Sequence, residues 1–229
     1  MNSRLSKNIL GFLFFSAFLF NANAQQTDKV YLSGLDFEHP AEWDFYCTDG
    51  NNSKVWTKIN VPSQWELEGF GEYTYGRWYK ELNQKEPSKE EGLYKYEFDV
   101  PTDYKDKTVL IAFGGAMTDT EVKINGKTAG PIHQGGFYEF KYDISSLLKL
   151  GSKNTLEVHV WKHSANKSVN NAERRADWWL FGGIYRPVWL EVSPKTQIQH
   201  IAVNPKMDGS ITVDLNLQNI SKNTILEAS

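Results

Sequence analysis

A succession of short segments with a two-residue hydrophobic period constrains the fold of this chain most. Residues 94–100 alternate apolar and charged side chains, and residues 156–160 and 188–192 repeat the period. Such alternation is typical of strands with one buried face and one face in water. The turn dipeptides Asn125-Gly126 and Asp208-Gly209 accept positive φ and favour hairpins. We therefore expect an all-β chain that begins with a jelly-roll β-sandwich.

Helix signals are few. Asp143 is placed to cap a short helix over residues 144–148, and Gly151 is placed to end it. The longest stretch without a strand pattern is residues 60–92, which is rich in aromatic residues and glycine. Long ordered loops in compact domains carry function more often than short ones. This loop is therefore a candidate ligand-binding segment.

The first residues have the pattern of an export signal. Arg4 and Lys7 precede the apolar run 9–20, and Ala22-Asn23-Ala24 matches a small-x-small cleavage site. The alternative is a membrane anchor, but a run of about a dozen residues is shorter than the roughly 20 that span a bilayer. We expect a signal peptide at residues 1–24, a secreted or periplasmic protein, and no membrane span after cleavage.

Pro194 marks a predicted domain boundary. Residues 25–193 form the expected jelly-roll domain, and a new hairpin pattern follows over residues 197–217. A two-stranded hairpin is marginal by itself. We expect residues 194–229 to be the beginning of an incomplete immunoglobulin-like domain, so that the chain is either a fragment of a longer protein or a truncated gene product.

Composition narrows the classes of function. The 25 basic and 28 acidic residues nearly balance, so nucleic acid is not an expected partner. Cys47 is the one cysteine, which excludes an internal disulfide and predicts a buried or half-buried thiol. The five histidines show no ligand spacing and no nucleotide fingerprint is present, so we expect neither metal nor cofactor. Aromatic residues are abundant, and a flat indole can either pack in a core or cover a pyranose ring.

Three stretches, in order, carry a family resemblance. They are Val61-Pro62-Ser63-Gln64-Trp65, the run 121–144 with Asn125-Gly126 and Gly135-Gly136-Phe137, and the run 177–188 that begins Asp177-Trp178-Trp179. Together they resemble glycoside hydrolase family 2, which contains β-galactosidases, β-glucuronidases and β-mannosidases. The resemblance covers roughly residues 30–193. It implies a sugar-binding jelly roll, followed by an immunoglobulin-like domain and a TIM barrel that carries the active site.

The resemblance also implies where catalysis takes place. Glycoside hydrolysis needs two positioned carboxyl groups, and in this family both are barrel glutamates, one of them preceded by asparagine. The present sequence contains no Asn-Glu dipeptide. We expect no catalytic residue in it, no hydrolysis by this chain alone, and a missing catalytic barrel as its partner. Its own loop carboxylates are predicted to be solvated surface charges; these are Glu66, Glu68, Glu72, Glu90 and Glu91.

Five residues are predicted to bind substrate. By the resemblance, Asp177 reaches the sugar beside Trp179; the alternative for Asp177 is a structural turn cap. Arg77 follows Tyr75 where some family members carry asparagine; it suits an acidic or sulfated sugar, or is a plain surface residue. The full predicted set is Asp177, Trp179, Arg77, Tyr75 and Trp65.

The favoured interpretation is the N-terminal, sugar-binding portion of a secreted family 2 glycoside hydrolase, β-galactosidase-like and active in carbohydrate degradation. Its ligand would be a β-glycoside oligo- or polysaccharide. Two alternatives stay open: a free-standing carbohydrate-binding module, and a structural β-sandwich without a ligand.

Overall fold

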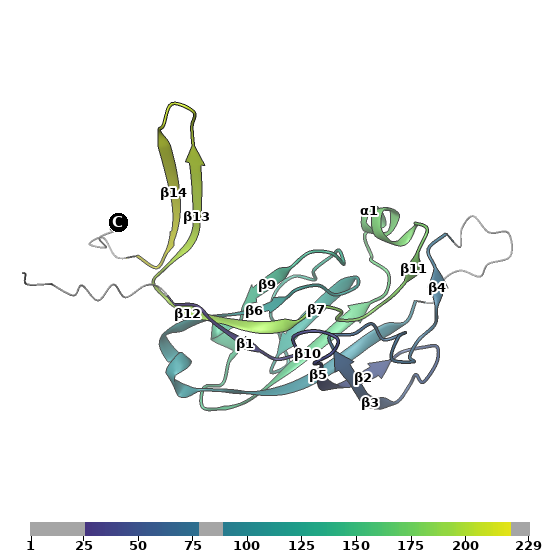
Figure 1. The fold of residues 1–229 in the computed structure, drawn as a ribbon. Coiled ribbons are helices and arrows are strands. Elements are labelled where there is room, and N and C mark those ends of the chain that lie inside the picture. The colour runs from purple at the N-terminus through teal and green to yellow at the C-terminus, as the bar shows by residue number, and fades with distance from the viewer. Residues whose placement is uncertain (1–25, 78–88, 221–229) are drawn as a thin grey trace, which may run out of the picture.

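The chain folds into a β-sandwich, as the two-residue period predicts (Figure 1). A computed structural model describes residues 26–77 and 89–220, so the predicted signal peptide at 1–24 lies outside the described residues. One sheet has six strands in the order β3-β2-β5-β10-β7-β8, and the other has four in the order β1-β12-β6-β9. All pairings within the two sheets are antiparallel.

The strands of the six-stranded sheet are β2 (Ala41–Cys47), β3 (Trp56–Val61), β5 (Glu91–Val100), β7 (Asp119–Ile124), β8 (Lys127–Thr128) and β10 (Ser152–Trp161). Those of the four-stranded sheet are β1 (Asp28–Tyr31), β6 (Lys107–Phe113), β9 (Phe140–Asp143) and β12 (Val188–Pro194). Two further pairs are β4 (Thr74–Tyr75) with β11 (Trp179–Leu180), and β13 (Gln197–Pro205) with β14 (Ile211–Gln218).

The core lies between the two sheets, where the alternating positions point inward. In β10 the inward side chains of Leu156, Val158 and Val160 are buried, while their neighbours are partly exposed. Burial of such a side chain contributes about 1.5–3 kcal/mol. The largest fully buried rings of this core belong to Trp43, Trp65, Tyr94, Phe45 and Phe113.

Turn chemistry sets the ends of several elements as predicted. Asn125 and Gly126 have φ of 53° and 77° and join β7 to β8, because only residues that tolerate positive φ close so short a loop. The Asp143 carboxylate accepts hydrogen bonds from the Ser145 amide and hydroxyl. The helix predicted over 144–148 is only a 3-10 turn, η3 (Ser145–Leu147); so few residues cannot sustain an α-helix on their own.

Two of the remaining helical turns lie near one end of the sandwich. They are α1 (Lys167–Val169), whose first turn is capped by the Asn166 side chain, and the π-helical turn η4 (Asn170–Arg174). A 3-10 turn, η2 (Thr102–Asp106), joins β5 to β6. Figure 1 shows α1, β4 and β11 together at the end opposite the β13–β14 hairpin. No helix in residues 26–77 and 89–220 is long and apolar enough to cross a bilayer.

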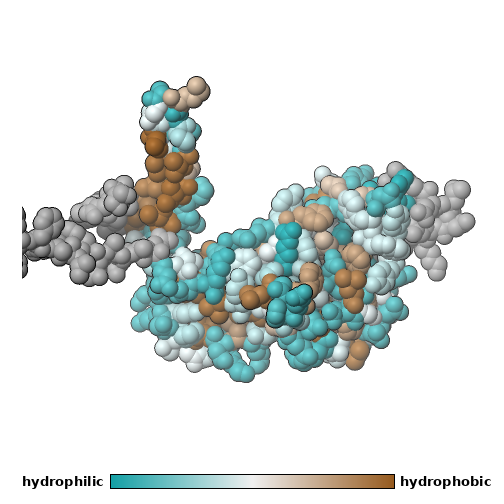
Figure 2. Space-filling model, in the orientation of Figure 1, coloured by the Kyte–Doolittle hydropathy of each residue, from teal (hydrophilic) through white to brown (hydrophobic). Residues whose placement is uncertain are grey.

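The predicted hairpin after Pro194 is present and turns at Gly209, which has a φ of 84°. It projects from the end of β12 and carries an exposed apolar strip (Figures 1 and 2). The strip contains Ile201, Val203, Ile211, Val213 and Leu215, each at least 40% exposed. That this hairpin opens an immunoglobulin-like domain stays a prediction.

Cys47 is a buried free thiol, as the single cysteine predicts. Burial raises the pKa of its thiol to about 11, because the low-polarity surroundings disfavour a thiolate.

Candidate functional site

Two short strands that are distant in sequence build an exposed aromatic surface. β4 and β11 pair antiparallel, with Tyr75 opposite Trp179 and Thr74 opposite Leu180. Thr74 and Leu180 are buried, so the alternation of the strands turns Tyr75 and Trp179 outward. The amide of Gly76 donates to the Trp178 carbonyl at 2.8 Å and extends the pairing by one step.

We call Tyr73, Tyr75, Trp179 and Phe181 the aromatic surface. Trp179 meets Tyr75 and Tyr73 edge to face, with ring centroids 5.4 and 6.0 Å apart. Tyr73 also meets Phe181 edge to face at 6.0 Å. Trp179 is 53% exposed and Tyr73 is 52% exposed. A water-exposed group of large rings supplies flat apolar area of the kind that the C–H face of a sugar ring can cover.

An ion pair borders the aromatic surface. Arg77 Nη1 donates to Asp177 Oδ2 at 2.6 Å, and the two side chains are 41% and 60% exposed. An exposed pair contributes at most about 1 kcal/mol, so a ligand can compete for either partner. The carboxylate accepts from hydroxyl groups and the guanidinium donates to oxygen acceptors. These groups match the hydrogen-bonding chemistry of a sugar.

The structure therefore brings four of the five predicted binding residues together, namely Asp177, Trp179, Arg77 and Tyr75. Whether they bind a sugar stays a prediction. Residues Trp78 and Tyr79, which the 60–92 loop also carries, lie outside the described part of the chain.

Trp65 does not belong to this surface. Its side chain is fully buried and stacks on Phe45 with centroids 6.2 Å apart. Its amide donates to the Gly182 carbonyl at 3.1 Å, and a Cβ on Gly182 would lie 2.0 Å from the indole ring. A buried indole has no face free for a sugar, so this burial argues against sugar contact by Trp65. The Trp65 indole instead packs directly against the backbone of Gly182.

Two glutamates predicted to be solvated are buried, which corrects the sequence analysis. Glu66 and Glu90 both pair with Lys162, and all three side chains are fully inaccessible. Lys162 Nζ lies 2.8 Å from Glu66 Oε1 and also donates to the Glu72 carbonyl. Burial raises the pKa of Glu66 even though Lys162 opposes the shift. We call Glu66, Glu90 and Lys162 the buried ionic cluster.

A sequence signal for this cluster existed in β10. The inward positions 156, 158 and 160 are apolar, and the same period places residue 162 inward. A lysine at an inward position requires a buried carboxylate as its partner, because an unpaired buried charge is strongly unfavourable. This constraint is incompatible with Glu66 and Glu90 both being surface charges. Glu68 and Glu72 are exposed, as predicted.

The buried ionic cluster is not arranged for hydrolysis. A retaining glycosidase places a nucleophile and an acid on either side of the scissile bond, about 5 Å apart and open to the sugar. Glu66 and Glu90 instead share one lysine in the interior, and both oxygens of Glu66 accept from the Gly182 amide, at 2.9 and 3.1 Å. No sugar reaches them. Nor do the described residues contain a group of three or more His, Cys, Asp or Glu placed to hold a metal ion.

Comparisons with known proteins assign the chain to a family. Residues 16–194 match the model of the sugar-binding domain of glycosyl hydrolases family 2. A β-galactosidase of Thermoanaerobacter pseudethanolicus is 35% identical over 140 residues, which are 58% of this chain and 19% of the relative. A putative β-glucuronidase of Formosa agariphila is 31% identical over 181 residues, 77% of this chain and 16% of the relative.

A solved structure agrees in fold. The crystal structure of a putative β-galactosidase from Bacteroides fragilis superposes with a TM-score of 0.61 at 25% identity. The match covers 86% of this chain and 29% of that protein. The chain thus spans less than a third of the length of these relatives.

Proposed function

The chain belongs to glycoside hydrolase family 2, and from this premise we propose that it is the N-terminal sugar-binding part of a secreted, β-galactosidase-like hydrolase that degrades carbohydrate. In this proposal the aromatic surface forms one wall of a sugar site, and hydrolysis takes place in a separate catalytic barrel. The observation that carries it is the convergence of Trp179, Tyr75, Asp177 and Arg77 on one exposed surface of the matched domain.

The chemistry of the surface supports a sugar over other ligands. Exposed rings supply apolar contact, and the adjacent carboxylate and guanidinium supply hydrogen bonds to hydroxyl groups. The proposed ligands include acidic sugars, because the guanidinium of Arg77 can pair with a carboxylate or a sulfate. Matching relatives are named both β-galactosidase and putative β-glucuronidase. Export is part of the proposal and rests on the signal pattern at residues 1–24.

The test is sugar binding by the purified chain, followed through NMR chemical shifts of the tryptophan indole N–H groups. We expect methyl β-galactoside to shift the Trp179 signal with a Kd near or above 1 mM, because one open wall buries little of a monosaccharide. Trp179→Ala should abolish saturable binding. Trp56→Ala is the matched control, since Trp56 is 46% exposed on β3 and belongs to another surface.

Three results would reject parts of the proposal. Equal loss of binding in Trp56→Ala would show that the aromatic surface is not the site. Micromolar affinity would favour the free-standing carbohydrate-binding module, and no saturable binding of any glycoside would favour the structural sandwich. Hydrolysis of nitrophenyl glycosides that persists through repurification and disappears in Asp177→Ala would contradict a separate catalytic barrel.

A further inference from the structure

Two rings of the aromatic surface lie just beyond the strand pair that builds it. The strands β4 and β11 pair only at Thr74 with Leu180 and at Tyr75 with Trp179. Tyr73 precedes β4 and Phe181 follows β11, and their rings meet edge to face at 6.0 Å. The strand pairing does not reach the backbone of these two residues. Other contacts must therefore set where their rings lie.

On the side of β4, the buried ionic cluster holds the backbone of Glu72, the residue before Tyr73. The Glu72 amide donates to Glu90 Oε1 at 3.1 Å, and the Glu72 carbonyl accepts from Lys162 Nζ at 2.5 Å. The side chain of Glu72 is exposed, so the two buried charges contact only its backbone. This carbonyl belongs to the peptide group that joins Glu72 to Tyr73, so Lys162 fixes the point from which the Tyr73 ring projects.

On the side of β11, the same cluster holds the peptide group that follows Phe181. The Gly182 amide donates to both oxygens of Glu66, at 2.9 and 3.1 Å. The Phe181 carbonyl, at the other end of this peptide group, accepts from Arg174 Nη1 at 3.0 Å. Burial lowers the pKa of Arg174 to about 10 against the opposing effect of Glu173 and Glu66, so the guanidinium is charged at neutral pH.

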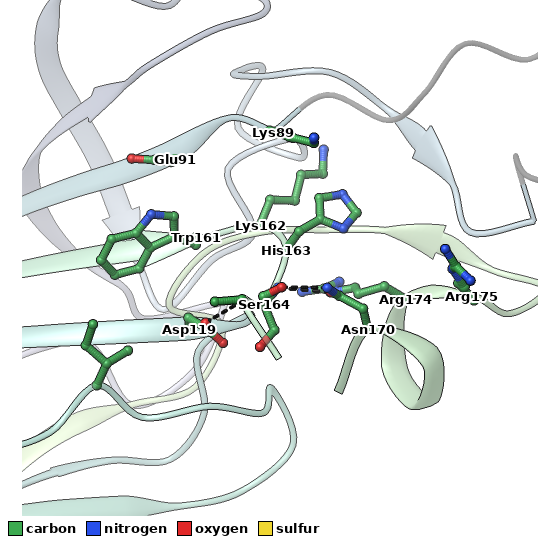
Figure 3. A pocket seen from close by; sticks show the side chains of 12 residues that line it. Lys89, Glu91, Asp119, Trp161, Lys162, His163, Ser164, Asn170, Arg174 and Arg175 are labelled. Carbon is green, nitrogen blue, oxygen red and sulfur yellow. Dashed lines mark hydrogen bonds between the residues drawn. The ribbon is translucent and has the colours of Figure 1, made fainter. Parts of the chain in front are cut away.

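Lys162 connects the two sides. Its Nζ lies 2.8 Å from Glu66 Oε1 and also donates to Glu90 Oε1. Figure 3 shows Lys162 and Arg174 among the residues around one cavity of about 610 Å³. Both side chains are buried, at 0% and 4% exposure, so the partners of their charged groups lie within the protein. One lysine thus links the glutamate that holds the Phe181 segment to the glutamate that holds the Tyr73 segment.

Buried charges hold a peptide group more firmly than neutral groups do. Hydrogen bonds with one ionised partner are roughly twice as strong as neutral ones, and the low polarity of the interior strengthens them. Apolar side chains of similar volume often stabilise a fold as well as a buried ion pair. Stability of the fold is therefore not a sufficient reason for three buried charges at this place, whereas their contacts with the two backbone segments give a specific one.

We propose that the buried ionic cluster positions the aromatic surface for a sugar. It holds the backbone beside Tyr73 and Phe181, and Tyr73 transmits this order to Trp179, whose ring it meets edge to face at 6.0 Å. The members of the cluster are positioning residues and do not touch the ligand. The role in sugar binding rests on the proposed function, whereas the order of the surface without a ligand does not.

The experiment uses Glu66→Gln and Glu90→Gln in the full chain. Each substitution preserves the size of the side chain and leaves Lys162 with one carboxylate, so we expect both variants to fold. Ile111→Val and Ile111→Ala are the controls, because Ile111 is fully buried in β6 and belongs to neither held segment. The two controls lower stability to a smaller and a larger extent, and so bracket the loss caused by the glutamine variants.

Native-state amide hydrogen exchange is the first measurement. In Glu66→Gln, the Gly182 amide should exchange about fivefold to tenfold faster relative to the Val158 amide of β10. That factor is the difference between a hydrogen bond to a charged group and one to a neutral group. In Glu90→Gln, the Glu72 amide should change in the same way. The Ile111 controls should raise neither ratio.

The second measurement is the Kd of methyl β-galactoside, followed through the Trp179 indole N–H signal. Both glutamine variants should raise this Kd about twofold to tenfold, the effect of ordering one more side chain on binding. The Ile111 controls should leave it unchanged, since a change in global stability does not move the rings of a folded surface.

Several outcomes would overturn the proposal. One is an unchanged exchange ratio in both glutamine variants, and another is an equal rise in Kd in the Ile111 controls. Should a glutamine variant fail to fold, the unmodified chain decides. Its Gly182 and Glu72 amides should exchange about as slowly as Val158, and exchange as fast as in an open loop would overturn the proposal. An unmodified chain that binds no glycoside would reject the proposed function alone, because the exchange ratios need no sugar.

Discussion

Replacement of Lys162 by methionine is expected to destabilise the domain strongly. The side chains of Lys162, Glu66 and Glu90 are all fully inaccessible, and the lysine forms an ion pair with each glutamate. Methionine preserves the length of the side chain but removes its charge, so that both buried ion pairs are lost. Removal of one partner from a buried pair costs about 3–5 kcal/mol. For a domain of this size that corresponds to a fall in Tm of about 6–20 °C.

The measurement is urea unfolding of the unmodified chain and the variant at pH 7, with intrinsic tryptophan fluorescence as the signal. Lys153→Met is the matched control, because its partner Glu97 and Lys153 itself are 64% and 68% exposed and lie 3.3 Å apart. Loss of such a pair should change the free energy of unfolding by no more than about 0.5 kcal/mol. The contrast isolates burial as the cause.

The pH dependence of Lys162→Met gives a second test. Burial already raises the pKa of Glu66 when the lysine is present, and removal of the lysine raises it further. A carboxyl whose folded-state pKa is raised favours the folded state at low pH and loses that advantage as pH rises through the raised pKa. The difference between the variant and the unmodified chain should therefore shrink as pH falls from 7 toward 5.

The triple variant Lys162→Met, Glu66→Gln, Glu90→Gln should recover most of the lost stability, because neutral amides need no counter-charge. Three results would refute this account of the buried ionic cluster. Lys162→Met would lower the free energy of unfolding by less than about 1 kcal/mol, the loss would not vary with pH, or the triple variant would recover no stability.

Two further predictions concern single residues. Gly182→Ala would place a Cβ 2.0 Å from the ring of Trp65, and overpacking of this kind lowers the free energy of unfolding by about 1–3 kcal/mol or more. Urea unfolding measures this loss. An unchanged free energy of unfolding would mean that the Trp65 ring can move aside. The pKa of His163 is lowered to about 4 by burial and by the neighbouring positive charge of Arg174. An unfolded histidine takes up its proton near pH 6.5, so this residue should reduce stability as pH falls from 6.5 toward 4 and have no effect above that window. His163→Gln should flatten the slope of stability against pH in this window, and an unchanged slope would show that His163 is already protonated in the folded domain.

Local chemistry explains why the fold can be predicted from the sequence. The period of residues 156–160 requires one buried face whatever its partners, and Asn125-Gly126 accepts the positive φ of a tight turn. The segment 144–148 shows where local signals lose accuracy. Asp143 does accept hydrogen bonds from Ser145, but a cap specifies where a helical turn begins and not how far it continues.

The candidate site was predictable only in part, because its contacts join distant segments. Tyr75 and Trp179 pair across more than a hundred residues, and the family resemblance rather than any periodicity placed them in one site. The same resemblance gave no indication that Trp65 is buried. A tryptophan in a glycine-rich loop has the same local sequence whether it faces water or supports another loop, and its contact with Gly182 decides the matter.

The peptide unit between Phe181 and Gly182 lies between Arg174 and the buried ionic cluster. Its carbonyl accepts from Arg174 Nη1 at 3.0 Å, and its N–H donates to both oxygens of Glu66. The buried guanidinium of Arg174 and the buried carboxylate of Glu66 thus hold opposite ends of one peptide group, which fixes its orientation more firmly than neutral hydrogen bonds would. Phe181 belongs to the aromatic surface, so charged partners hold the backbone of this part of the surface in place, and in the proposed function this reduces the conformational freedom that a bound sugar would remove.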